Sequence, residues 1–210
     1  MRTSVRHVSI VVGAAALALC LSSCGTPPWA DPSLAPTHGA SAHAHPSTSK
    51  ATSKSTITPT VNDLASGSTK RVLTAGDITL TVTYWSDLAM NKWTAAAQKP
   101  LSISATATLG TDAGQSVYLS KLTITPAVSA GNKQVAAPEP LTDPATVSPG
   151  YAIKSPYSYT QTFTIPPLDS HATSIVLTLD YELLLQTTPT SSAYAKQSVS
   201  DTLTIALHTK

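Results

Sequence analysis

Cysteine carries the most reactive side chain in this sequence, and it occurs only twice, at Cys20 and Cys24. A cysteine thiolate is a strong nucleophile and can take up a covalently attached group. Because both cysteines lie near the N-terminus, the rest of the chain holds no pair for a disulfide. What either thiol could do therefore depends on the residues around it.

The residues in front of Cys24 are typical of an export signal. Arg2 and Arg6 give a basic start, and Val8–Leu21 is an uncharged, mostly apolar run of 14 residues. A signal-peptide core has about 7–15 such residues, whereas a membrane span needs about 20. The two arginines are not adjacent, which argues against a twin-arginine signal. We therefore predict that residues 1–23 are a signal peptide.

The four residues Leu21, Ser22, Ser23 and Cys24 resemble the lipobox of bacterial lipoproteins. The resemblance implies that Cys24 receives a diacylglycerol on its sulfur and becomes the new N-terminus, which would place the protein on the extracytoplasmic face of the cell membrane. Serine is less usual than glycine or alanine just before the cysteine, and Cys20 fits poorly because a bulky leucine precedes it. The alternatives are a plain signal peptide with an incidental cysteine, or an uncleaved anchor helix.

Residues 24–67 are rich in Pro, Ser, Thr and Ala, with hardly any large apolar side chains. Such a segment cannot bury enough apolar surface to offset the entropy lost on ordering it. We therefore expect a lipidated, disordered tether, and we expect residues 25–66 to be dispensable for folding.

Three histidines, His38, His43 and His45, lie in this tether. Imidazoles close in sequence can share zinc, copper or nickel. No acidic partner lies near them, and no predicted scaffold fixes their geometry. We assign no metal and no cofactor, and keep metal acquisition through these histidines as an alternative function.

Two groups of residues have the types needed for catalysis. Asp169, Ser170 and His171 are the residue types of a hydrolytic triad, but three adjacent residues on a turn rarely align as nucleophile, base and orienting group. Asp180 and Glu182 lie on one face of a predicted strand, roughly 7 Å apart, a separation that could suit a carboxylate pair. We interpret both groups as solvated polar surface and assign no catalytic residue; an enzyme with an unrecognised site is the other alternative.

Aromatic residues outside the predicted core are the candidates for binding. Trp85 follows Tyr84 on a predicted strand and points to the opposite face, Trp93 lies in the insertion after it, and Tyr151 lies in a long loop. Exposed aromatic rings can stack on sugars or on a partner's side chains. We predict that Trp93 is partly exposed; the alternative is that these rings pack within the domain.

The elements that would hold these side chains are strands. In residues 78–85, Ile, Leu, Val and Tyr alternate with Thr and Trp, a period of two that predicts a strand with one buried face. The other predicted strands are 69–74, 101–109, 116–126, 157–165, 172–186 and 196–208. The apolar phase slips at Ser120-Lys121, which predicts a β-bulge.

Two segments break this alternation. In residues 87–98, Met90, Trp93 and Ala97 share a helical face, which predicts a short helix or helical loop. Residues 128–156 contain five prolines and no clear strand; a loop of this length is often functional.

Residues 68–210 are thus predicted to form an all-β domain, an antiparallel immunoglobulin-like β-sandwich of about seven strands with one short helical insertion. In architecture it is similar to the immunoglobulin-like domains of exported bacterial proteins, but it lacks the disulfide and the tryptophan that lies between the paired cysteines on the third strand.

Charge narrows the possible partners. Of 210 residues, 11% are charged, and without Arg2 and Arg6 the basic and acidic side chains are equal in number. A neutral chain argues against nucleic acid and against electrostatic docking on anionic lipid. The sequence therefore favours a membrane-anchored, non-enzymatic binding module, with another envelope protein or a cell-wall glycan as its partner.

Overall fold

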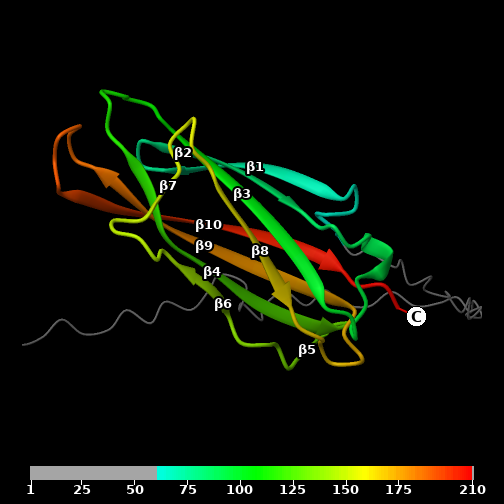
Figure 1. Cartoon of the computed structure of the whole chain (residues 1–210). Helices are drawn as coiled ribbons and strands as arrows, with labels where there is room; N and C mark the ends of the chain where they lie inside the picture. Colours follow the sequence, from blue (N-terminus) through cyan, green and yellow to red (C-terminus); the bar gives the residue numbers. More distant parts are fainter. Residues whose placement is uncertain (1–60, 210) are drawn as a thin grey trace, which may run out of the picture. The chain divides into compact units, whose positions relative to one another are not determined.

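A computed structural model describes residues 61–209, which form two antiparallel sheets (Figure 1). The first sheet has the order β1-β2-β3-β8, with bounds Ser68–Ala75, Ile78–Trp85, Lys99–Leu109 and Tyr159–Ile165. The second has the order β10-β9-β4-β5, with bounds Tyr194–Ala206, Ser174–Gln186, Val117–Ala130 and Lys133–Val135. Two short strands, β6 (Leu141–Pro144) and β7 (Tyr151–Ala152), also pair with β4. The prediction of an all-β, antiparallel domain is confirmed.

Buried and partly exposed residues alternate along the strands, as the sequence predicted. On β2 every second residue from Ile78 to Tyr84 is buried, and on β9 the same holds from Ile175 to Leu183. The threonines between the apolar residues of β2 lie on the outer face of the first sheet. Branched and aromatic side chains suit such a pleated, half-buried surface, which is why these segments form strands.

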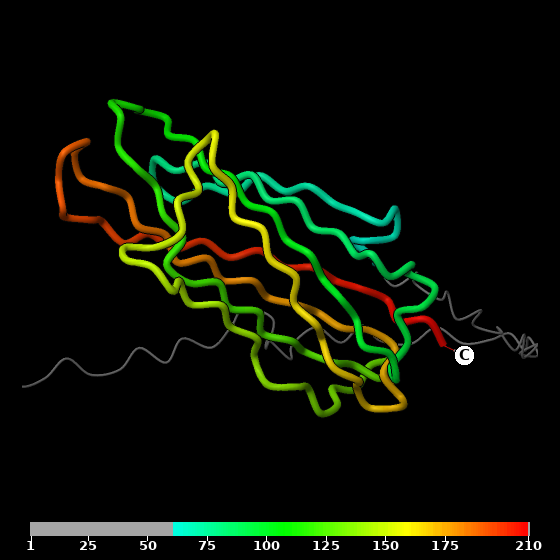
Figure 2. Tube along the Cα trace, in the orientation of Figure 1, coloured from blue at the N-terminus to red at the C-terminus, as the bar shows by residue number. Residues whose placement is uncertain are grey.

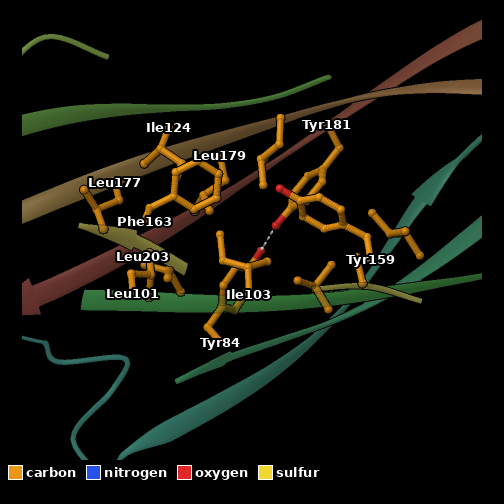
Figure 3. Packing of buried hydrophobic residues seen from close by; sticks show 14 of the residues in the cluster. Tyr84, Leu101, Ile103, Ile124, Tyr159, Phe163, Leu177, Leu179, Tyr181 and Leu203 are labelled. Carbon is orange, nitrogen blue, oxygen red and sulfur yellow. Dashed lines mark hydrogen bonds between the residues drawn. The ribbon is translucent and has the colours of Figure 1, made fainter. Parts of the chain in front are cut away.

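The buried faces of both sheets contribute to one hydrophobic cluster (Figure 3). Two tyrosines meet across it: the Tyr84 hydroxyl donates a hydrogen bond to Asp201 Oδ2 at 2.9 Å and accepts one from the Tyr181 hydroxyl at 2.9 Å. Burial raises the pKa of both phenols above the usual value, so both hydroxyls keep their protons. Tyr84 comes from the first sheet and its two partners from the second, so this short chain of hydrogen bonds joins the sheets.

The bulge predicted in β4 is confirmed, because the register with β9 shifts between Leu119 and Lys121. The extra residue, Ser120, donates its hydroxyl proton to the carbonyl oxygen of Glu182 and accepts a backbone hydrogen bond from Ala145. On the other edge of β4, β5, β6 and β7 pair in turn with its successive parts. Part of the long segment in which we predicted no strand is therefore a set of three short strands.

The helical insertion predicted in residues 87–98 is a single 3-10 turn, η1 (Met90–Lys92). The rest of that segment is irregular, and Trp93 directly after the turn enters the core. In residues 61–209 no helix is long and apolar enough to cross a membrane.

The folded domain begins before Ser68, where the tether was predicted to end. Leu64 is fully buried, with an exposed fraction of 0%. Asp63 donates its backbone N–H to the Thr204 carbonyl and accepts the Thr204 N–H on its carboxylate, at 2.8 and 2.7 Å. Its carboxylate also pairs with Arg71 at 2.7 Å. Residues 63 and 64 are thus docked on β10, so we expect their removal to destabilise the fold, contrary to the prediction that residues 25–66 are dispensable.

We therefore expect Leu64→Ala to lower the free energy of unfolding by about 2–5 kcal/mol, as is typical of a buried leucine. The measurement is denaturant unfolding of the full chain. Val61, which is 62% exposed, offers a matched control: Val61→Ala should change stability by less than about 0.5 kcal/mol. Equal unfolding midpoints for Leu64→Ala and wild type would show that Leu64 does not dock.

The strands run between two ends of the domain, which we call the proximal and the distal end (Figure 2). At the proximal end the chain enters through Asp63 and Leu64, and the last strand leads to Leu207 and His208, beside η1 and Trp93. At the distal end lie loop 110–116, segment 153–158 and loop 187–193. Figure 1 shows the β9–β10 connection, in orange, at the opposite end of the domain from the C-terminus.

Candidate functional site

Trp93, which we predicted to be partly exposed, is fully buried. Its indole Nε1–H donates a hydrogen bond to Ser86 Oγ at 3.1 Å, and its backbone carbonyl accepts one from the N–H of His208 at 2.8 Å. Burying so large an apolar ring stabilises the fold, and its one polar atom has a partner. Trp93 belongs to the core, so the prediction of its exposure is wrong.

The other two predicted binding residues do not lie together. Trp85 ends β2 and is half-buried on the outer face of the first sheet, beside Ser68 and Ser102 on the neighbouring strands. Tyr151 lies in β7, where its ring stacks on Tyr159 with centroids 5.7 Å apart. The three aromatic residues therefore do not make one binding surface.

Asp169, Ser170 and His171 form a local hydrogen-bonded turn. Ser170 Oγ and Asp169 Oδ1 both contact the same imidazole nitrogen, His171 Nδ1, each at 3.2 Å. A hydrolytic triad needs the serine and the aspartate on different nitrogens, so that the ring can pass a proton between them. These contacts are those of a local polar turn at the surface.

Asp180 and Glu182 of β9 are held by surface contacts. Lys121 and Lys196 both form ion pairs with Glu182, and Ser200 donates its hydroxyl proton to Asp180. Hydrogen bonds from the two lysines lower the pKa of the Glu182 carboxyl. A carboxyl held ionised in this way is poorly suited to donate a proton as a general acid.

The lipobox residues Leu21–Cys24 and the three tether histidines lie outside the described residues. Across residues 61–209 no three metal-binding side chains gather at one point.

Lys99, the first residue of β3, is a buried cation that sequence analysis did not single out. Its Nζ donates hydrogen bonds to the carbonyl oxygens of Thr94, Ala95 and Ala97, at 3.2, 3.4 and 2.5 Å. Burial lowers the pKa of its ammonium group to about 8. The side chain satisfies carbonyl groups of an irregular segment and has no exposed surface, so we interpret it as a structural support for residues 94–97.

Two adjoining cavities lie at the proximal end, with volumes of about 850 and 530 Å³. They share Thr94, Ala96 and His208. Half of the residues that line the two cavities are small or apolar, and the polar half includes the ionisable side chains of Lys92 and His208.

The distal end carries a smaller cleft of about 420 Å³ with a different lining. We call it the tyrosine cleft, and define it by its lining residues: 114–118, Ala152, Lys154, Ser155 and Tyr157. Tyr118 and Tyr157 are its aromatic side chains. Tyr157 is 64% exposed, a high value for so large a ring.

Backbone hydrogen bonds to both sheets fix one wall of the cleft. Ile153 donates its N–H to the carbonyl of Val117 on β4 at 3.0 Å, and its own carbonyl accepts the N–H of Ala107 on β3 at 2.7 Å. Ser155 then donates its N–H to the carbonyl of Ala107 at 3.0 Å. Segment 153–155 therefore crosses from one sheet to the other with its backbone held at each step.

Lys154 links segment 153–155 to loop 110–116, which forms the opposite wall of the cleft. Lys154 Nζ donates hydrogen bonds to Asp112 Oδ1 at 2.6 Å and to the Gln115 carbonyl at 2.8 Å. The hydrogen bond from Lys154 lowers the pKa of the Asp112 carboxyl, which therefore stays ionised beside the lysine at neutral pH. The pair leaves the cleft close to electrically neutral.

Loop 110–116, which carries Asp112, is fixed at its first residues by Asp77. Asp77 accepts the backbone N–H of Thr111 on both carboxylate oxygens, at 3.2 and 2.9 Å. A Cβ atom on Gly110 would lie 2.6 Å from Asp77 Oδ1, so glycine allows this close approach. At the far end of the loop, Ser116 donates its N–H to the side-chain oxygen of Gln186 at 3.1 Å. The cleft is thus formed before any ligand arrives, which reduces the entropy lost on binding.

The tyrosine cleft was not predicted from the sequence. Residues 157–165 were predicted to form one strand, but β8 begins at Tyr159, and Tyr157 lies in the exposed turn before it. The proline before Tyr157 was a sign that the strand begins later.

Neither comparison with family models nor comparison with curated proteins finds a match to this sequence. A function for the chain therefore has to be inferred from its own residues.

Proposed function

We propose that the chain is a membrane-anchored, extracytoplasmic lipoprotein that presents a non-enzymatic binding domain. The observation that carries this proposal is the sequence Leu21-Ser22-Ser23-Cys24 at the end of the predicted export signal. A diacylglycerol on Cys24 supplies two acyl chains, and two chains give stable attachment where one gives only marginal binding.

The arrangement of the described domain suits presentation from an N-terminal anchor. The chain enters at the proximal end through Asp63 and Leu64, while the tyrosine cleft lies at the distal end. β9 and β10 are each 13 residues long, so they separate the two ends by roughly 40 Å. A domain held at its proximal end thus keeps the cleft away from its point of attachment, where a partner can reach it.

We infer that the domain is an immunoglobulin-like sandwich at the level of architecture. Seven of its strands have seven or more residues, and they lie in two antiparallel sheets that share one core. The connectivity differs from that of immunoglobulin domains, because β3 lies between β2 and β8 in the first sheet. The likeness is therefore one of layers and strand number.

Protease treatment of spheroplasts tests the proposal. Because the domain is proposed to lie outside the cytoplasm, added protease should digest it while a cytoplasmic marker protein in the same cells stays intact. Detergent lysis before the protease is the control, and should expose both proteins. A domain that resists protease until the cells are lysed would contradict an extracytoplasmic location, provided that the purified protein is digested under the same conditions.

A further inference from the structure

We propose that the tyrosine cleft binds a neutral saccharide chain with equatorial hydroxyl groups, of the β-1,4-linked glucose or N-acetylglucosamine type. This assignment rests on the proposed function, since it is the extracytoplasmic position that brings the domain to envelope glycans.

The aromatic side chains are the first reason for a sugar. A pyranose ring with equatorial hydroxyls has two flat faces made of C–H groups, which stack well on an aromatic ring. Tyr157 is 64% exposed and lies in a segment that backbone bonds hold in place just before it, at Ile153 and Ser155. A tyrosine brings a large contact area and has few rotatable bonds to immobilise.

The polar groups of the cleft can form hydrogen bonds with the hydroxyl groups at the edge of a sugar ring. Ser116 and Ser155 carry hydroxyls, which can both donate and accept hydrogen bonds. The Lys154 ammonium group has three N–H donors, of which Asp112 and the Gln115 carbonyl take two. The third N–H can serve a ligand hydroxyl or an acetamido oxygen.

Charge and size narrow the class of ligand further. Lys154 is the charged residue in the lining of the cleft, and Asp112 neutralises it at 2.6 Å, so no net charge attracts a phosphate or a carboxylate. A volume of about 420 Å³ is at the small end of ligand sites, which run from about 300 to 1,000 Å³. The cleft therefore suits a short stretch of a neutral chain.

Calorimetric titration of the full-length protein in detergent tests this assignment. The probes are tetramers of β-1,4-linked N-acetylglucosamine and of β-1,4-linked glucose, and inorganic phosphate is the anionic probe. We expect at least one tetramer to bind with a Kd of about 1 mM or below. Binding of phosphate alone, or no binding of either tetramer at about ten times that concentration, would overturn the assignment.

Variants at Tyr157 show whether the binding is in the cleft. Tyr157→Ala should weaken binding about tenfold or more, which corresponds to about 1.4 kcal/mol, while Tyr157→Phe keeps the ring and should stay close to wild type. Val72 on β1 has the same exposed fraction, 64%, outside the cleft, so Val72→Ala is the matched control and should bind as wild type does. Equal affinity in Tyr157→Ala and wild type would place the sugar elsewhere and refute the proposal.

The two proposals fail in different ways. If the domain is digested in spheroplasts but neither tetramer binds, the ligand assignment is wrong and the anchored binding module stands. If the domain resists protease until lysis, the proposed location is wrong whatever the titration gives.

Discussion

Trp93→Ala is expected to lower the free energy of unfolding by about 3–5 kcal/mol, the usual cost of removing a buried tryptophan. The indole is fully buried, and its N–H bonds to Ser86 Oγ. Alanine would leave a large cavity at the proximal end and remove a hydrogen bond. For a domain of this size the melting temperature should fall by on the order of 10 °C or more.

Thermal unfolding of the full chain measures this effect. Trp85→Ala is the matched control, because Trp85 is half-buried on the outer face of the first sheet, and its removal should cost clearly less. If the two variants melt at the same temperature as each other, Trp93 does not hold the proximal end together as its burial indicates.

Cys24→Ala is expected to abolish membrane attachment of the mature protein. Each buried methylene of a lipid contributes about 0.8 kcal/mol to membrane binding, so losing two acyl chains removes the anchor entirely. The variant should be released or keep its uncleaved signal. Fractionation of cells into membrane and soluble pools measures the result.

Cys20→Ala provides the control for this experiment. Cys20 lies four residues before Cys24 within the predicted signal peptide, so its loss should leave fractionation unchanged. Recovery of mature-sized Cys24→Ala protein in the membrane pool would mean that something other than lipid on Cys24 holds the chain.

The strands that were predicted well are those in which one face is buried along the whole length. β2 and β9 show an unbroken period of two because every second side chain enters the shared core. The bulge at Ser120 was also visible, because an extra residue must shift the apolar phase on a strand with a single buried face.

The short strands could not be predicted in the same way. β5, β6 and β7 have two to four residues each, too few to show a period, and prolines surround them. They exist because β4 offers a long edge with backbone groups to pair, which is a property of the assembled sheet.

The burial of single apolar residues in irregular segments was not predicted either, because it depends on the assembled fold. Leu64 is one leucine in a polar stretch, and Trp93 follows a three-residue turn; both are buried by contacts with strands far away in the sequence. The tyrosine cleft is another such case, since residues 114–118 and 152–157 are brought together by the pairing of β7 with β4 and by the bonds of segment 153–155 to both sheets.

The mass of the N-terminal peptide of the protein extracted from membranes tests the proposed lipid anchor most directly. A lipid anchor on Cys24 predicts a peptide that begins at Cys24 and is heavier than its amino-acid sequence by a diacylglyceryl group on the sulfur. A peptide that begins at Cys24 without added lipid, or a chain that still begins at Met1, would contradict it.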